Sequence, residues 1–471
     1  MRLSLVFQLT LVLVFILNPD RSPAQRMPIS LHPQNPHYFL YRDKPTILIT
    51  SAEHYGAVLN LDFDYIPYLD ELKSKRLNLT RTFTGAYLEP SGAFNITANV
   101  LAPKPAKFIC PWLRSEEPGH TLGGNKFDLT RWDPAYFERL RDFVSSAEKR
   151  GIIVELALFC PFYKDDQWIG SPMYAANNIN GLGNVQREEV YTMDKHGGLY
   201  AIQEAMVRKI VQELQQYGNV IYEICNEPYF GGVTMEWQHQ IASVIDETEK
   251  ELGVRHLISQ NIANHTALIT NPHPAVSLFN FHYASPPVAV GQNYHLNKAI
   301  GNNETGFRGQ QDSTYRKEGW EFILAGGTLY NNLDYSFTAD HEGGDFRYPE
   351  KQPGGGSTSL RTQLGYLADF INSFTFVQMK PDSLFIADGL LSPSVGYVLA
   401  EPGQQYAVYL LHAGGAQLSL QLPSGRYKLD WLNPVTGVYI SKDKMVHKGG
   451  MARVTVPENT FDIALRIVRK K

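Results

Sequence analysis

Short apolar runs rich in β-formers alternate along most of the chain with longer segments of helical periodicity. Continuous apolar runs are typical of parallel strands that are buried on both faces. Asp133 followed by Pro134 favours a helix start, because Asp caps the first turn and proline is tolerated there. The expected strands are 46–50, 78–83, 152–158, 220–225, 257–260, 277–282, 298–303 and 328–333, and the expected helices are 64–75, 134–150, 199–217, 236–252, 315–324 and 360–374.

Eight strand-and-helix units in series predict an α/β protein, a closed (β/α)₈ TIM barrel. Three connections that follow strands are unusually long, namely 84–132, 159–197 and 335–359. Because all three come after strand carboxyl ends, they should rise over the same rim of the barrel. Active sites of this fold lie on that rim.

The pattern changes after residue 378, where short alternating strands and turn residues replace the helical segments. This favours a small antiparallel β-sandwich over 379–471, after a barrel domain over 25–378. Residues 28–44 predict a strand pair that either caps the barrel floor or joins the sandwich.

The first 24 residues have the pattern of a signal peptide. Arg2 precedes a mostly apolar run over 3–17, and small residues follow at 22–24. The run is short for a membrane span, so we expect cleavage and a secreted or periplasmic protein, with an uncleaved anchor as the alternative. No second run is long enough to span a membrane, so the mature chain is expected to have none.

Composition narrows the partners and cofactors that the protein is expected to bind. The 471 residues are 43% hydrophobic and 19% charged, with a formal net charge of −4, so a nucleic-acid partner is not expected. Of the three cysteines, Cys160 and Cys225 end apolar runs and are expected as small buried hydrophobes. No Cys-x-x-Cys or His-rich spacing indicates a metal site, and neither a metal nor an organic cofactor is expected.

The sharpest chemical signal is Asn226-Glu227-Pro228, which ends the fourth expected strand. Pro228 stops the strand, so Asn226 and Glu227 should face the cleft at the rim. Cleaving a glycosidic bond requires a proton for a poor leaving group, and a glutamic acid can supply it. A neighbouring amide can bind the sugar 2-hydroxyl, an interaction that strengthens in the transition state.

This segment resembles glycoside hydrolases of clan A, which contains the family 5 cellulases and mannanases. The resemblance implies that Glu227 is the acid/base and that a second carboxylate comes from the seventh strand. Glu304, in Glu304-Thr305-Gly306, is the matching nucleophile candidate. Asn78-Leu79-Thr80-Arg81 resembles the clan's Asn-x-x-Arg and implies that Arg81 lies near the nucleophile and favours its ionised form.

Further residues are expected around these two carboxylates or inside the barrel. Asp334 and Glu53 are reserve nucleophiles, because each follows an apolar run, whereas Glu155 and Glu223 fall inside strands and are interpreted as an internal polar network. The other candidates for sugar binding follow strands or lie in the long loops: His282, Tyr283, His54, Tyr55, Trp168 and Asn331.

Together these features predict a secreted retaining glycoside hydrolase that cleaves β-glycosidic bonds in poly- or oligosaccharides by double displacement. A carbohydrate is the expected partner. Retention requires the two carboxyl groups to lie about 5–5.5 Å apart. Two alternatives stay open: a non-catalytic carbohydrate-binding protein on a degenerate barrel, and a transglycosylase.

Overall fold

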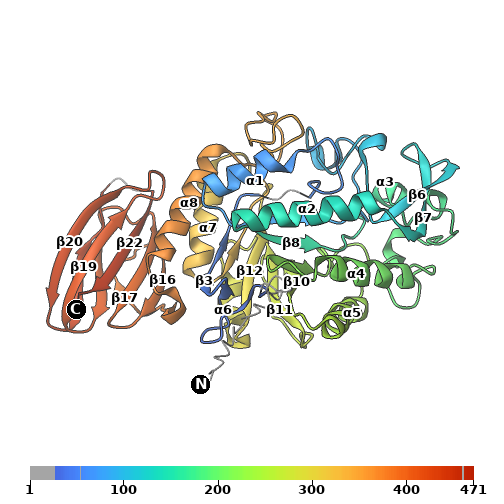
Figure 1. Cartoon of the computed structure of the whole chain (residues 1–471). Coiled ribbons are helices and arrows are strands. Elements are labelled where there is room, and N and C mark those ends of the chain that lie inside the picture. Colours follow the sequence, from blue (N-terminus) through green and yellow to red (C-terminus); the bar gives the residue numbers. More distant parts are fainter. Residues whose placement is uncertain (1–26, 53–54, 459–460, 471) are drawn as a thin grey trace, which may run out of the picture.

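A computed structural model describes residues 27–52, 55–458 and 461–470 of the chain, which form a barrel and a smaller β-domain side by side (Figure 1). The expected signal peptide over 1–24 and the candidates Glu53 and His54 lie outside the described residues. Among the helices described, none has the length and apolar character needed to cross a membrane.

The predicted (β/α)₈ barrel is confirmed. Its eight parallel strands follow one another in the order β4-β13-β12-β11-β10-β9-β8-β5. All eight fall within or overlap the expected runs. They are β4 (Leu48–Ile49), β5 (Leu79–Phe83), β8 (Ile153–Ala157), β9 (Val220–Glu223), β10 (Leu257–Asn264), β11 (Val276–His282), β12 (Ala299–Glu304) and β13 (Leu329–Tyr330).

Asn78 bridges the seam between the first and last strands of this sheet, β4 and β5, near their starts, and the Phe83 N–H donates to the Tyr55 carbonyl farther along. The Asn78 side chain accepts a hydrogen bond from the Ile49 N–H at 2.9 Å and donates one to the Ile47 carbonyl at 2.8 Å. Its backbone N–H donates to the Ile49 carbonyl at 3.3 Å. Asn78 therefore takes the place of a regular strand ladder at this point.

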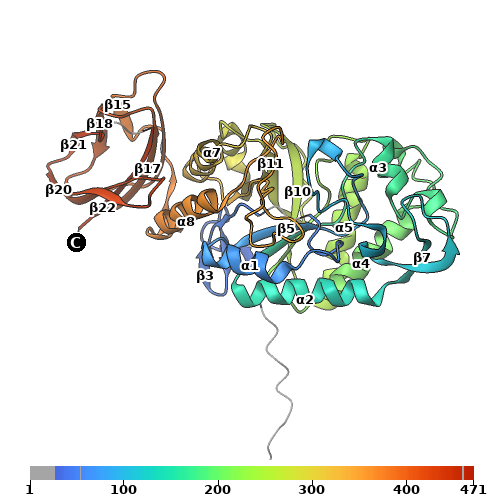
Figure 2. The same cartoon turned by 90° about the horizontal axis from the view of Figure 1, so that it is seen from above.

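Helices surround the barrel, as the view from above shows (Figure 2). Asp133 caps its helix as predicted, accepting from the Ala135 N–H, and Gly151 ends that helix in the left-handed conformation. The chain passes from β10 to β11 by a loop. The helices are α1 (Tyr65–Ser74), α2 (Pro134–Arg150), α3 (Asp165–Gly170), α4 (Tyr200–Leu214), α5 (Met235–Leu252), α6 (Val288–Asn293), α7 (Asp312–Leu324) and α8 (Thr358–Asn372).

The N-terminal segment caps the barrel floor and does not join the sandwich. It forms three antiparallel strands, β1 (Ser30–Leu31), β2 (Phe39–Tyr41) and β3 (Lys44–Thr46), where a pair was expected. Ile29 and Phe39 pack in one apolar cluster with residues at or near the starts of the barrel strands, such as Leu79. At the opposite end, the loop after β5 carries a hairpin of β6 (Trp112–Pro118) and β7 (Asn125–Trp132).

The C-terminal domain has two antiparallel sheets, as predicted for a β-sandwich. The sequence pattern missed β14, β15 and β16, which are short or carry glycine. One sheet has six strands: β14 (Lys380–Pro381), β16 (Val395–Glu401), β17 (Gln405–Leu411), β22 (Asp462–Arg469), β19 (Gly425–Leu432) and β20 (Tyr439–His447). The other has three: β15 (Ile386–Asp388), β18 (Gln417–Leu422) and β21 (Gly450–Thr455).

Barrel and sandwich share a packed interface on α7. Arg316 forms a two-pronged ion pair with Asp462 of β22, with Nε–Oδ2 at 2.9 Å and Nη2–Oδ1 at 3.0 Å. Both side chains are buried, and Tyr409 also donates to Asp462. The Trp320 and Tyr409 rings stack across the same interface at 5.3 Å.

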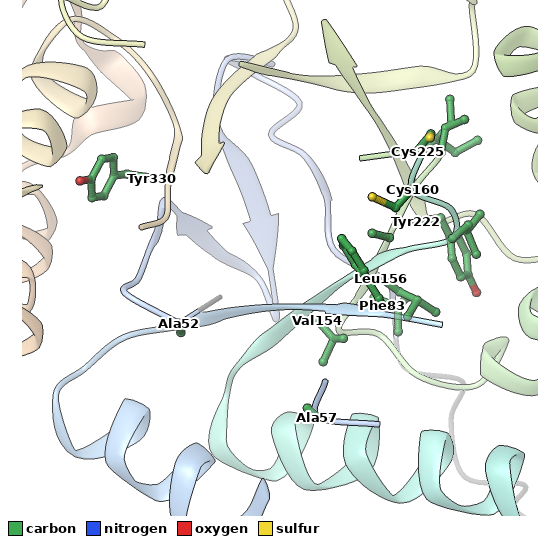
Figure 3. Close-up of a cluster of buried hydrophobic side chains, with 14 of the residues drawn as sticks. Ala52, Ala57, Phe83, Val154, Leu156, Cys160, Tyr222, Cys225 and Tyr330 are labelled. Carbon is green, nitrogen blue, oxygen red and sulfur yellow. The ribbon is translucent and has the colours of Figure 1, made fainter. Parts of the chain in front are cut away.

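The three cysteines are free and buried. Figure 3 shows Cys160 and Cys225 within a cluster of buried hydrophobic side chains that also includes Leu156 and Tyr222. The interpretation of Cys160 and Cys225 as small buried hydrophobes is therefore confirmed.

Candidate active site

The two carboxylates predicted to carry the chemistry meet at the rim of the barrel. Glu227 follows β9 and Glu304 ends β12, and one oxygen of each lies within 4.8 Å of the other. His282, the last residue of β11, lies between them. Its Nδ1 is 3.2 Å from Glu227 Oε1 and 3.5 Å from Glu304 Oε1.

Local irregularities of the backbone orient the side chains of His282 and Glu227. His282 lies opposite Glu304 in the β11–β12 pair, immediately after a register shift at Phe281. Glu227 has a positive φ of 37°, which is strained for a residue with a side chain. Its N–H donates to Asn261 Oδ1 at 3.1 Å, which helps to hold this conformation.

Arg81 lies beneath both carboxylates, fully buried, and binds several acceptors at once. It forms a two-pronged ion pair with Glu223 and an ion pair with Glu304 at 3.1 Å. Its Nη2 also donates to Asn226 Oδ1 at 2.6 Å. Arg81 thus lies beside Glu304, which is the position that the Asn-x-x-Arg motif implied.

Two phenols complete the surroundings of Glu304. Tyr283 donates to Oε1 at 2.7 Å, and Tyr55 donates to Oε2 in a short hydrogen bond. Arg81 in turn contacts the Tyr55 hydroxyl at 2.7 Å. These donors all stabilise negative charge on Glu304, which suits a nucleophile.

Glu227 has a different set of partners. Tyr163 donates to its Oε2 at 2.6 Å, and Tyr229 donates to its Oε1 at 3.3 Å. Tyr163 also accepts from Asn226 Nδ2 at 3.0 Å, which fixes the amide beside the carboxylate.

The pKa values of Glu227 and His282 move in opposite directions. Burial pushes the pKa of Glu227 upward, but the His282 hydrogen bond and charge, with Tyr163 and Arg81, outweigh it and hold that pKa below its usual range. Burial alone would lower the pKa of His282, yet the charges of Glu304 and Glu227 raise it. In the ligand-free site the shared proton is therefore held on the imidazole side of the pair.

A second polar layer lies inside the barrel, as predicted for Glu155 and Glu223. Asn303 donates to both carboxylates, at 3.1 and 2.8 Å. Burial, reinforced by the charge of Glu223, raises the pKa of Glu155 to about 7. This network supports Arg81 from below and lies outside the cavity.

A cavity of about 300 Å³ opens over the two carboxylates, and its walls come from the three long loops and the strand ends. Phenyl and phenol rings form much of its surface, which suits the apolar faces of a sugar. The aromatic lining residues are Tyr55, Phe83, Tyr87, Phe94, Tyr163, Phe230, Tyr283, Phe307, Tyr335 and Phe337.

Three predicted residues do not offer a free group to this cavity. The Trp168 indole is buried in its own loop and donates to the Val185 carbonyl at 2.9 Å. The Asn331 amide is buried and bonds the backbone of Ala52. Asp334 reaches the cavity wall, but its carboxylate forms an ion pair with Arg361 at 2.8 Å. We therefore interpret Asp334 as a residue that stabilises the loop after β13.

The sequence interpretation did not commit to four polar residues that line or bound the site: Tyr163, Tyr229, Asn264 and Glu89. Tyr163 is an aromatic residue of the long loop over 159–197, and Tyr229 follows Glu227 by two positions, so both carried a weak signal. Asn264 accepts from Tyr229 at the end of β10. Glu89 lies within a loop of nearly fifty residues, where no pattern marks it.

Within the described part of the chain, Glu227, His282 and Glu304 form the group of side chains whose ligand atoms are close enough to hold a cation. Their ligand atoms are close enough, and nitrogen and oxygen donors suit zinc. However, Arg81, Tyr55, Tyr283 and Tyr163 already satisfy these carboxylates, and a guanidinium contacts Glu304 directly. The donor set fits a charge-balanced acid–base pair better than a metal centre.

Comparisons with known proteins also point to glycoside hydrolases. Residues 113–258 match the family model of cellulase (glycosyl hydrolase family 5). A search of curated proteins finds no match.

Among solved structures, the chain resembles a putative glycoside hydrolase from Bacteroides vulgatus, with 15% identity, a TM-score of 0.67 and coverage of 95% of this chain and 83% of the other. A glycoside hydrolase family 5 protein from the same organism gives 12% identity, a TM-score of 0.64 and coverage of 94% and 95%. The resemblance predicted from the strand-end motifs is thus confirmed, and the fold is that of family 5 glycoside hydrolases.

Proposed function

We propose that this protein is a retaining β-glycosidase in which Glu304 is the nucleophile and Glu227 the acid/base. The observation that carries the proposal is that the two carboxylates face each other at the rim, where one oxygen of each lies within 4.8 Å of the other and both lie close to His282 Nδ1. Retaining pairs lie about 5–5.5 Å apart, whereas inverting pairs lie about 6.5–9.5 Å apart to admit a water molecule.

In the first step Glu304 attacks the anomeric carbon and the bond to the leaving oxygen breaks as Glu227 protonates that oxygen. Hydrogen bonds from Arg81, Tyr55 and Tyr283 hold Glu304 in position until it attacks. The product is a glycosyl ester on Glu304.

His282 links proton delivery to this attack. The charge of Glu304 is the largest influence that raises the pKa of His282, and esterification removes that charge. As Glu304 attacks and its charge is lost, the imidazole yields its proton through Nδ1 to Glu227 Oε1, which lies 3.2 Å away, and Glu227 passes this proton to the leaving oxygen. Glu227 thus becomes a stronger proton source as the nucleophile loses its charge.

In the second step Glu227 acts as a base. It removes a proton from water, the water oxygen attacks the anomeric carbon, and Glu304 leaves as a carboxylate. The sugar departs with its original configuration, and the restored charge on Glu304 raises the pKa of His282 again.

The test is a pair of substitutions assayed on a panel of aryl β-glycosides. Glu304→Ala should lose at least a thousandfold in kcat and regain turnover with azide, giving a glycosyl azide of inverted configuration, because azide replaces the missing nucleophile. Glu227→Gln should lose about 10²–10⁴-fold on poor leaving groups while sparing the first step with activated ones.

Full activity in Glu304→Ala would contradict the assignment. A protein that binds glycans but releases no product would indicate the carbohydrate-binding alternative. Dominant transfer to added sugar acceptors would indicate a transglycosylase.

We also propose that residues 1–24 are a cleaved signal peptide, on the strength of the apolar run over 3–17. The N-terminal sequence of the exported protein would begin near residue 25. A mature protein that retains residue 1 would contradict cleavage.

A further inference from the structure

Glu89 is a third carboxylate in the cavity that the proposed chemistry leaves unused. It lies in the long loop after β5 and lines the same cavity as Glu227 and Glu304. Its residue surface is only 8% exposed, so the carboxylate faces the cavity and its wall, not bulk solvent.

Neutral groups hold this carboxylate in place. Tyr87 donates to Oε1 at 3.0 Å and Asn99 donates to Oε2 at 2.5 Å. The Glu89 N–H donates to the Leu101 carbonyl, and the Asn99 side chain accepts from the Leu101 N–H. These hydrogen bonds connect the segment around Glu89 to the segment around Leu101.

No ion pair to Glu89 occurs among the described residues. A carboxylate offers about four acceptor positions, and these two donors occupy two of them. Glu89 can therefore accept further hydrogen bonds from a ligand in the cavity.

All the charged residues in the described lining of the cavity are acidic. Arg81 carries a positive charge nearby, but it is fully buried and engaged with Glu223, Glu304 and Asn226. Arg361 pairs with Asp334 and His282 with Glu227, so Glu89 is the lining carboxylate whose charge no described cation balances, and a sugar bearing a carboxylate would face that charge with no free cation to pair with it. The acidic lining residues are Glu89, Glu227, Glu304 and Asp334.

We propose that Glu89 is a substrate-binding residue that accepts hydrogen bonds from sugar hydroxyls and selects uncharged glycosides against glycosides of uronic acids. This inference rests on the proposed glycosidase function and names its substrate class. Glu89 takes no part in bond breaking.

Because Glu89 can ionise, its preference for uncharged glycosides over uronic acid glycosides should depend on pH. Burial raises its pKa to about 7, with the charge of Glu304 adding to the effect and the Asn99 and Tyr87 hydrogen bonds opposing it. The titratable groups that face it are Tyr87 on its own loop, Glu304 at the end of β12 and Cys160 after β8. Above pH 7 Glu89 is an anion, and below it the added proton removes the charge.

The experiment measures kcat/KM for matched 4-nitrophenyl pairs, β-glucoside with β-glucuronide and β-galactoside with β-galacturonide, at pH 6 and pH 8. The uronide carboxylate is ionised at both. The catalytic groups act on both members of a pair, so their own titration largely cancels in the ratio of neutral to uronide kcat/KM.

We expect the wild-type ratio to exceed 100 at pH 8 and to fall severalfold at pH 6. Glu89→Gln should lower the ratio at pH 8 at least tenfold and make it independent of pH. Glu89→Asp, which keeps the charge, should keep the pH dependence. Glu116→Gln, an exposed carboxylate of the same loop, is the matched control and should leave the ratio unchanged.

A wild-type ratio near one, a ratio that does not change with pH, or a Glu89→Gln ratio equal to that of the wild type would overturn the inference while leaving the glycosidase function intact. If Glu89→Gln fails to fold, Glu89→Asp still tests the point, because loss of the pH dependence in a variant that keeps the charge would contradict the inference. Cleavage of no glycoside of any class would instead overturn the proposed function, and the inference with it.

Discussion

His282 joins the two catalytic candidates, because its Nδ1 lies within 3.5 Å of both carboxylates. A neutral imidazole could only donate one hydrogen bond there, whereas a protonated one also neutralises charge. His282 was a candidate from its place at the end of the sixth expected strand, but only the distances show that one ring contacts two acids. His282 therefore determines where the proton shared with the two carboxylates is held.

Replacing His282 with Asn should make stability depend on pH in a defined window. The pKa of Glu227 is lowered from 4.5, so its contribution is fully present above that value and is lost as the pH falls through the folded-state pKa. The pKa of His282 is raised from 6.5, so its contribution is fully present below that value and is lost as the pH rises through the folded-state pKa.

The free energy of unfolding should thus differ most between wild type and His282→Asn from pH 4.5 to 6.5, by about 1–3 kcal/mol, and less on either side. Urea titrations across pH 4–9 measure it. The exposed His412→Asn, at a positive φ that asparagine tolerates, is the control and should show no such window. A difference constant with pH would contradict the charged pair.

At the scale of elements, the barrel strands could be predicted because each is a short buried run rich in β-formers, although polar side chains such as Arg81 and Glu155 interrupt the apolar pattern. The same reasoning placed Glu227 and Glu304 at strand ends. Loop residues such as Glu89 and Tyr163 could not be placed, since their positions depend on long-range contacts that leave no period in the sequence. Trp168 was misjudged for the same reason: its ring packs within its own loop.

Asn78 is the element-scale feature most open to test, because its side chain bridges the barrel seam. Asn78→Ala removes two hydrogen bonds and leaves a strand N–H and carbonyl without these partners. We expect a loss of about 2–3 kcal/mol in the free energy of unfolding, measured by urea denaturation. Asn372→Ala, at the exposed end of α8, should change it by less than about 0.5 kcal/mol. Equal effects of the two substitutions would contradict closure by Asn78.

At the scale of the whole molecule, the sandwich is an integral part of the packing. One apolar cluster runs from the barrel into Leu399, Tyr409 and Ala464 of the C-terminal sheet. The buried Arg316–Asp462 pair lies at that junction. We infer that the two domains unfold together, and that the sandwich supports the wall of α7 and α8 (Figure 1).

Arg316→Met should destabilise the protein by about 3–5 kcal/mol, because it leaves Asp462 buried without its cation. Calorimetry should show one transition for the wild type and two for this variant, as the domains lose their coupling. Adding Asp462→Leu should recover much of the loss, since an apolar pair can replace a buried ion pair. Arg347→Met, at an exposed arginine, is the control; a single unshifted transition in Arg316→Met would contradict the coupling.

The pairing of Glu227 with Glu304 as acid/base and nucleophile can be tested most directly by trapping the covalent intermediate. The protein is incubated with the activated 2-deoxy-2-fluoro analogue of its best aryl glycoside, digested and mapped by mass spectrometry. We predict one added fluorosugar per chain, carried by the peptide that contains Glu304. Stoichiometric labelling of any other residue, or turnover with inverted product configuration and no label, would contradict the assignment.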